Sequence, residues 1–228
     1  MLASSGSAQP SQESVKLHGV FTHYLLRGLS GEASVKRDSN VRLTELSQFV
    51  IREVSSATDQ LQVPVLTGPG NVPDPLIVGP DAQYSKTVVI AIGNQNYYNP
   101  QWRLLHFGET DAQSFADFWR GQGATITTRI NATRADMQQV LVWAQANVDK
   151  ESLALFYYSG HALSLNGTSW LVPVDANDPG RISSQAISAA EIRGLLSRSS
   201  ARTQIVFIDA SFSGGFGISD VRLNELRK

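Results

Sequence analysis

Hydrophobic positions follow two alternating patterns along the chain from about residue 84 onward. Short apolar runs rich in β-branched residues are bounded by Gly, Asn or Asp, which is typical of buried strands. These runs predict strands at about 86–93, 124–130, 152–161 and 203–211. Between them, apolar residues recur at helical spacing, which predicts helices within 109–123, 131–148 and 187–198. Strand and helix therefore alternate, and we expect residues 84–217 to form an α/β fold with a parallel sheet covered on both faces.

The first 80 residues have a different pattern. After a small polar tract, the stretches "HGVFTHYLLRGLSG" (18–31) and "LTELSQFVIREVSSA" (43–57) have the spacing of amphipathic helices. We interpret His18 and His23 in the first of these helices as partly buried packing residues. The segment 64–85 is rich in Pro and Gly and predicts a connector, with a boundary near residue 80.

Charge and composition exclude several classes of partner. The 228 residues include 19 basic and 20 acidic ones, with a net charge of -1, so the chain offers no basic face for nucleic acid or an anionic membrane. No apolar run approaches the roughly 20 residues of a membrane span. We therefore expect a soluble protein of the cytoplasm with no nucleic-acid or membrane partner. The chain has no cysteine, so it has neither a disulfide nor a thiol nucleophile.

Sequence signals for cofactors and metals are weak. Gly93 stands in a turn without the repeated glycines of a phosphate-binding loop. The stretch 38–46 has several oxygen ligands but lacks the glycine and the 12-residue spacing of a calcium loop. We expect no cofactor and no metal site.

Two polar residues follow neighbouring apolar strands. His161 comes after "LFYYSG" and Ser211 comes after "IVFIDA", so both side chains are expected at the carboxyl edge of the sheet, where α/β folds bind ligands. A histidine beside a hydroxyl or thiol is the minimum for a nucleophile and its base. The alternative for His161 is a strand-end histidine satisfied by local hydrogen bonds.

The stretches "FYYSGHALSLNGTSWLVPVDAN" and "QIVFIDASFSGGFG" resemble the large-subunit part of the caspase-like cysteine peptidases, in particular bacterial metacaspases and orthocaspases. In caspases the catalytic His lies about 50 residues before the Cys, as His161 does before Ser211. The chain departs from the family pattern at Ala162, where a glycine is usual, and at Ser211, which replaces the nucleophilic cysteine. The resemblance implies a three-layer α/β/α sandwich with a mostly parallel central sheet.

The resemblance also implies roles for individual residues. His161 would be the acid/base, and the backbone N–H groups of Ala162 and Ser211 would form the oxyanion hole. Asp209 would line a pocket for the substrate Arg or Lys that precedes the cleaved bond. The alternative role for Asp209 is structural, as a carboxylate that caps the backbone amides of the turn. Ser5 and Glu13 are further candidates for this pocket, although Glu13 is equally well read as a solvated carboxylate.

The order of the parts differs from that of ordinary relatives. Residues 1–80 resemble the small-subunit part, which usually follows the large-subunit part, here 81–228. We interpret the chain as one caspase-like domain in circularly permuted order, with new ends in an exposed linker. The rival interpretation is a fragment of two tandem domains that pairs with a second copy by domain swapping. The two interpretations correspond to a monomer and a homodimer.

Two main classes of function follow. The first is a cysteine endopeptidase for protein or peptide substrates with a basic residue, inactive because Ser211 replaces cysteine. The second is a natural pseudopeptidase that serves as a protein-binding module. A serine hydrolase is the third alternative and ranks last, because serine needs a third group that orients the base and the sequence offers none. We expect negligible turnover by the chain as written.

Overall fold

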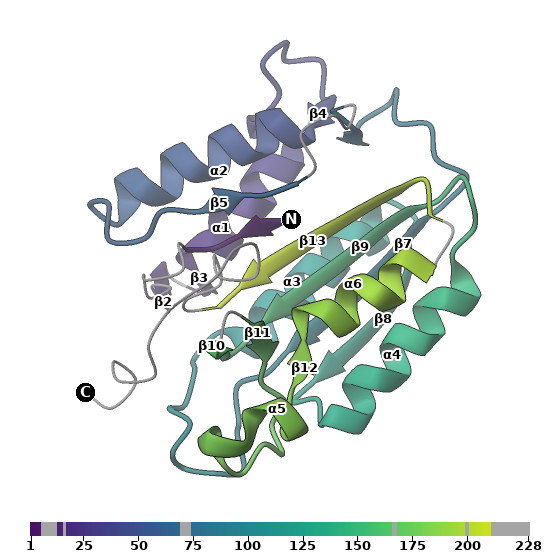
Figure 1. Ribbon diagram of the computed structural model, residues 1–228. Coiled ribbons are helices and arrows are strands. Elements are labelled where there is room, and N and C mark those ends of the chain that lie inside the picture. Colours follow the sequence, from purple (N-terminus) through teal and green to yellow (C-terminus); the bar gives the residue numbers. More distant parts are fainter. Residues whose placement is uncertain (6–12, 16, 69–73, 166–167, 199–200, 211–228) are drawn as a thin grey trace.

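The computed structural model describes residues 1–5, 13–15, 17–68, 74–165, 168–198 and 201–210. A six-stranded sheet forms the centre of the molecule (Figure 1). Its strands are, in spatial order, β5 (Val65–Leu66), β1 (Leu2–Ala3), β13 (Thr203–Asp209), β9 (Leu153–Ser159), β7 (Thr87–Gly93) and β8 (Thr125–Ile130). Only β5 runs antiparallel to its neighbour. The four strands predicted from apolar runs are confirmed, as is their parallel arrangement.

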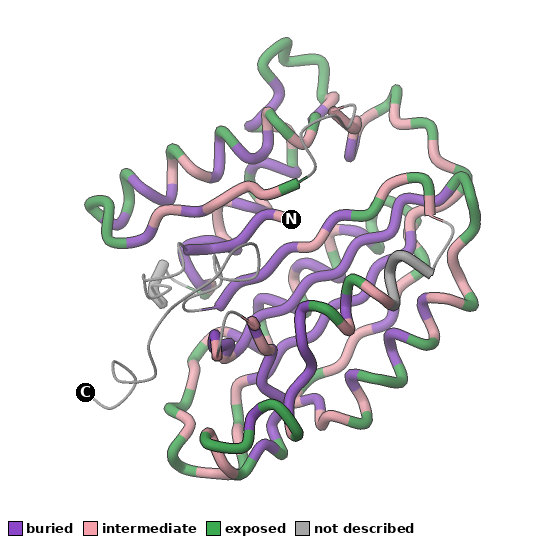
Figure 2. The backbone as a smooth tube through the Cα atoms, in the orientation of Figure 1, coloured by how far each residue is buried: buried purple, intermediate pink, exposed green. Residues whose placement is uncertain are grey.

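Helices cover both faces of the sheet and give the three-layer α/β/α architecture. One face packs against α1 (Val20–Arg27), α2 (Leu43–Ala57) and α3 (Gly108–Gly121). The other face packs against α4 (Arg134–Asn147) and α6 (Ala189–Arg198). The central strands are buried over nearly their whole length (Figure 2), as expected for parallel strands with helices on both sides. Phe115 of α3 stacks on Tyr157 of β9 at 4.5 Å between ring centroids, which joins these layers.

Shorter elements surround the sheet. They are β2 (Glu13–Val15) with β3 (His18–Gly19), β4 (Val41–Arg42) with β6 (Leu76–Val78), and β10 (Ala162–Leu165) with β11 (Thr168–Leu171) and β12 (Ile187–Ser188). The remaining turns of helix are η1 (Gly28–Glu32), η2 (Pro179–Arg181) and α5 (Ile182–Gln185). The predicted connector 64–85 thus contributes two short strands, β5 and β6, which the sequence did not predict. No helix in the described ranges is both long and apolar enough to cross a membrane.

Segments from opposite ends of the sequence lie side by side at β13. Strand β1 pairs with it in parallel, with Leu2 opposite Phe207 and Ala3 opposite Ile208. The backbone N–H of Ser4 continues this pairing by donating to the Ile208 carbonyl at 2.8 Å. The N-terminal residues therefore extend the same sheet that the later strands form.

The entry of α3 lies unusually close to the end of β7. A Cβ atom added to Gly93 would lie 2.2 Å from the Gly108 carbonyl oxygen and 2.8 Å from the Ala112 Cβ. Only a residue without a side chain lets the first turn of α3 approach the strand this closely. This contact fixes where the buried residues of that turn lie relative to the edge of the sheet.

We expect Gly93→Ala to lower the free energy of unfolding by about 1–3 kcal/mol, because the methyl group must displace backbone atoms. Denaturant titration measures the loss. The matched control is Gly121→Ala at the last residue of α3, where an added Cβ meets no atom within 4 Å. That change should be neutral or stabilise by up to about 1 kcal/mol, since alanine favours helix. Equal losses in both variants would contradict the steric argument.

Candidate active site

The ends of β9 and β13, which immediately precede the two predicted catalytic positions in the sequence, lie side by side at one edge of the sheet. Ser159 lies opposite Asp209 in the last register pair, and the Gly160 N–H donates to the Asp209 carbonyl at 3.2 Å. In the sequence, His161 lies two residues after Ser159, and Ser211 lies two residues after Asp209. The prediction that His161 emerges at the carboxyl edge is consistent with this register, whereas Ser211 lies outside the described residues.

The His161 ring lies in an aromatic setting that the sequence did not predict. Its centroid is 4.8 Å from that of Tyr97 and 5.7 Å from that of Trp102. Its Nε2 lies 2.6 Å from the backbone carbonyl of Arg103, so Nε2 carries the proton that this bond needs. In a neutral imidazole the proton on Nε2 makes Nδ1 the acceptor, which is the form a general base needs.

The Arg103 carbonyl supplies the orienting group that the sequence search did not find. A backbone oxygen that accepts from one imidazole nitrogen fixes the tautomer and the ring orientation. A backbone carbonyl leaves no side-chain signature, so a search for a third carboxylate could not detect it.

Two tyrosines hold the backbone of His161. The Tyr97 hydroxyl accepts from the His161 N–H at 2.7 Å, and the Tyr158 hydroxyl lies 2.7 Å from the His161 carbonyl. Burial raises the pKa of both phenols, so both stay protonated. The imidazole is therefore fixed at its backbone as well as at its ring.

The N-terminal segment fixes the backbone immediately before position 211. The Ala210 N–H donates to the Ser4 hydroxyl at 3.0 Å, and the Ser5 hydroxyl donates to the Ala210 carbonyl at 3.4 Å. Ser5 is buried, and its described hydroxyl contact is with this backbone. A role for Ser5 or for the backbone N–H of Ala162 in contacting substrate stays a prediction.

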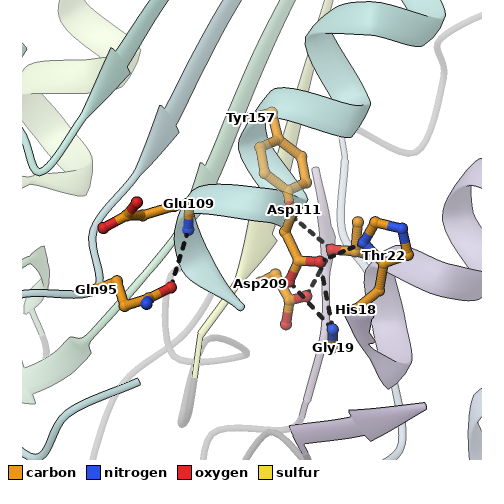
Figure 3. A network of polar contacts seen from close by, with 8 residues as sticks. All are labelled: His18, Gly19, Thr22, Gln95, Glu109, Asp111, Tyr157 and Asp209. Carbon is orange, nitrogen blue, oxygen red and sulfur yellow. Dashed lines mark hydrogen bonds and ion pairs between the residues drawn. The ribbon is translucent and has the colours of Figure 1, made fainter. Parts of the chain in front are cut away.

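Asp209 meets a second buried carboxylate, Asp111 of α3, beside Gly19 (Figure 3). Relative exposure is 6% for Asp209 and 2% for Asp111. A Cβ atom built on Gly19 would lie 3.1 Å from the Oδ2 atom of each aspartate, so the two oxygens are at most twice that distance apart. The Gly19 backbone therefore packs directly against both acids, and a side chain at this position would press on their carboxylates.

Donors from the N-terminal 80 residues satisfy both carboxylates. Asp209 Oδ2 accepts from the Thr22 hydroxyl at 2.7 Å, and the Tyr157 hydroxyl lies 2.5 Å from the same Thr22 oxygen. Asp111 accepts from the Gly19 N–H at 3.2 Å and from His18 Nδ1 at 2.9 Å. The acid pair thus joins β13, α3 and the segment from β3 into α1 (Figure 3).

Burial governs the charge of this pair. Desolvation raises the pKa of Asp111 to about 7, and the nearby charge of Asp209 adds to the rise. Hydrogen bonds from His18 and the Gly19 N–H act in the opposite direction. Asp111 therefore titrates near neutrality, which is typical of groups at functional sites.

The sequence analysis missed Asp111 and misplaced His18. Asp111 precedes Phe115 by one helical repeat, so a carboxylate on the buried face of a predicted helix was the available signal. His18 was interpreted as a packing residue within a helix; it lies in β3, and its ring bonds to Asp111. Glu13 pairs through its backbone with Gly19, which places its residue next to the acids, but its side chain is not described. Within the described ranges, no three His, Asp or Glu side chains are arranged to hold a metal.

The family model described as "Caspase domain" matches residues 86–224. A search among curated proteins finds no match. One matching solved structure is that of protein GSU0716 from Geobacter sulfurreducens, with 21% sequence identity and a TM-score of 0.44 over 55% of this chain. The alignment spans 50% of that protein, about half of its length.

Replacing Asp111 tests the electrostatics of the pair. The pKa of Asp111 in the folded protein lies above the ordinary value of 3.8. The contribution of Asp111 to the free energy of unfolding is therefore fully present below pH 3.8 and is lost as the pH rises through 7. Asp111→Asn removes this loss. Relative to the unmodified chain, the variant should gain on the order of 2–4 kcal/mol between about pH 4 and pH 8, measured by denaturation at each pH.

The control for this comparison is Asp117→Asn, an exposed carboxylate on the same helix that pairs with Arg120. The difference in free energy of unfolding between this variant and the unmodified chain should change little over the same pH range, because exposed ion pairs contribute little to stability. A flat pH dependence for the Asp111→Asn difference would show that Asp111 is ionised without cost.

Proposed function

The chain belongs to the caspase-domain family of peptidases, and we propose that it is a cysteine-endopeptidase domain for Arg or Lys that Ser211 holds inactive. The observation that supports this specificity is the pair of buried carboxylates, Asp111 and Asp209, which lie beside Gly19 at the end of β13. The proposal concerns both the chemistry at residue 211 and the pocket beside it.

Both acids of the proposed substrate pocket are buried and desolvated. The carboxylates of Asp111 and Asp209 both pack against Gly19, so a substrate side chain that reaches this corner would meet two acids. A cation there would offset the desolvation that raises the pKa of Asp111, whereas a neutral side chain would leave the second acid uncompensated. The pair therefore favours Arg or Lys and disfavours both neutral and acidic residues.

The proposed chemistry depends on the acidity of the nucleophile. His161, oriented by the Arg103 carbonyl, would act as the base for residue 211, and the backbone N–H groups of Ala162 and Ser211 would stabilise the oxyanion. A cysteine thiol has a pKa near 8.5 and is readily ionised beside an imidazole, whereas a serine hydroxyl is a far weaker acid. A site adapted to a thiolate thus loses turnover with serine while its pocket is unchanged.

A pseudopeptidase that binds basic peptides is the second candidate. The side-chain and backbone donors described for the acid pair, namely Gly19, Thr22 and His18, are independent of residue 211. The chain as written therefore has the means to bind a basic residue without cutting the peptide. The two candidates share one pocket and differ in whether cleavage returns with a thiol.

We also propose that residues 1–80 and 81–228 are the small- and large-subunit parts of one domain in circularly permuted order. The parallel pairing of β1 with β13 and the Ser4 contacts to Ala210 support this division, because the first residues extend the sheet of the later ones. The acid pair gives further support, since its donors lie in the first part and its carboxylates in the second.

Restoring the thiol tests the peptidase proposal. Ser211→Cys should cleave peptide reporters after Arg or Lys and react with a thiol-directed affinity label. Adding Asp209→Asn should lower kcat/KM for Arg reporters by roughly tenfold to hundredfold, because a charge-assisted bond is lost. The loss of thermal stability should be small by comparison, measured by denaturation of the same variant.

The outcomes separate the candidates. A Ser211→Cys protein that cleaves no basic reporter but binds a basic peptide in calorimetry would favour the pseudopeptidase. If Asp209→Asn unfolds the protein or leaves the Arg preference intact, Asp209 is a structural cap and the acid of the pocket lies elsewhere. A fluorophosphonate label on Ser211 of the unmodified chain would instead support a serine hydrolase.

The permutation predicts a folded monomer. If one copy of the chain supplies both parts, light scattering should give the mass of a single chain over a wide concentration range. A domain-swapped pair of half-domains would give twice this mass, since each half alone leaves a sheet edge and an apolar face uncovered. A stable dimer in dilute solution would contradict the single-domain interpretation.

A further inference from the structure

The hydroxyl of Tyr158 lies against the peptide group that joins His161 to Ala162. It donates to the His161 carbonyl at 2.7 Å and lies 2.9 Å from the Val172 carbonyl. The Tyr158 side chain is fully buried in the core between the sheet and α4 and α6, so packing fixes its position. Burial raises the pKa of Tyr158, and the hydroxyl therefore keeps the proton that it donates.

A second phenol holds the N–H side of His161. The Tyr97 hydroxyl accepts from the His161 N–H at 2.7 Å and is hydrogen-bonded to the Tyr158 hydroxyl. A Cβ atom added to Gly160 would lie 2.5 Å from the Tyr158 hydroxyl oxygen and 2.9 Å from that of Tyr97. Only glycine at position 160 lets both hydroxyls come this close to the backbone.

The direction of the His161 carbonyl determines that of the Ala162 N–H. The peptide bond between them is trans, so the two groups point in opposite directions. The Val172 N–H also donates to the His161 carbonyl, at 3.0 Å, and the next pair of this antiparallel ladder is Ala162 with Leu171. Hydrogen-bonded and non-hydrogen-bonded pairs alternate, so the Ala162 N–H points away from β11 and the ladder does not use it.

The Tyr158 bond adds direction and not merely a partner. A single hydrogen bond from Val172 would let the peptide group turn about that bond, whereas two donors on one carbonyl oxygen fix its orientation. Both carbonyls near the phenol also have another donor, the Val172 N–H for His161 and the Asn94 amide at 3.0 Å for Val172. Removing the phenol oxygen therefore leaves neither carbonyl without a donor, and we expect the variant to fold.

We propose that Tyr158 is a positioning residue for the oxyanion hole, because its hydroxyl fixes the His161–Ala162 peptide group and with it the direction of the Ala162 N–H. This inference rests on the proposed function and extends it to a buried residue that does not touch the substrate. When the nucleophile bonds to the substrate carbonyl carbon, the π electrons of the C=O bond move to its oxygen. An N–H already aimed at that oxygen stabilises the new charge without reorganisation.

The experiment compares Tyr158→Phe with Tyr84→Phe in the Ser211→Cys background. Each change removes one phenol oxygen, and the Tyr84 hydroxyl bonds to Thr203 at the opposite end of β13. Tyr158→Phe should lower kcat for an Arg reporter by roughly tenfold and leave KM within about twofold, because the oxyanion exists only in the transition state and intermediate. Tyr84→Phe should change neither constant.

Alkylation of the restored thiol separates a loss of oxyanion stabilisation from general damage to the site. In the reaction with iodoacetamide the sulfur displaces iodide, and no oxyanion forms. The alkylation rate should therefore be the same in Tyr158→Phe and in its parent. Equal losses in cleavage and alkylation would overturn the proposal, as would an unchanged kcat in Tyr158→Phe.

A second measurement needs no activity. Residual dipolar couplings report the direction of the Ala162 N–H by NMR, and in the chain with Ser211 this direction should change in Tyr158→Phe but not in Tyr84→Phe. If Ser211→Cys cleaves no reporter while the direction changes, the peptidase function fails and the role of Tyr158 in orienting the peptide group stands. If reporters are cleaved equally by Tyr158→Phe and Tyr84→Phe, the Tyr158 proposal fails and the peptidase function stands.

Discussion

The desolvation of two carboxylates beside Gly19 is the constraint on which the arrangement of the site depends. Asp111 and Asp209 come from a helix and a strand of the later part of the chain, and neither can be buried without donors. These donors are the Thr22 hydroxyl, the Gly19 N–H and the His18 ring, all from the first part. The acids therefore link the first and the later part of the chain at the place proposed for substrate binding. The need of two buried carboxylates for hydrogen-bond donors therefore affects both how the two parts of the chain pack and which residues lie at the site.

The strands and the position of His161 could be predicted because their signals are local. Apolar β-branched runs define β7, β8, β9 and β13 within a few residues, and a parallel sheet brings their carboxyl ends together by geometry alone. The register pair of Ser159 with Asp209 follows from this arrangement, and it places His161 near the predicted nucleophile position. The resemblance to caspase-like peptidases, which the family model confirms, added the roles that local patterns cannot assign.

The remaining site residues could not be predicted because their partners are distant or lack a side-chain signal. His18 and Asp111 are separated by 93 positions, and their contact exists only once α1 and α3 pack on the same face of the sheet. The Arg103 group that orients His161 is a backbone carbonyl, so the residue type at that position carries no information. The short strands of the connector, β5 and β6, pair with β1 and β4. This pairing stabilises them more than the intrinsic strand propensity of their residues does. Tertiary contacts decide each of these features.

Binding and bond cleavage depend on different atoms in this arrangement. In the proposed function, the basic residue is bound by carboxylates on α3 and β13 with donors between β3 and α1, whereas the chemistry requires the His161 ring and one atom at residue 211. Exchanging sulfur for oxygen at that atom changes the acidity of the nucleophile by several pKa units and leaves the charge of the pocket unaffected. Selection on binding can therefore preserve the acid pair after turnover is lost. For the same reason, a chain with an intact acid pair and a serine at the nucleophile position is physically consistent with an inactive peptidase and with a binding module. Restoring the thiol is the chemical change that distinguishes these two candidates.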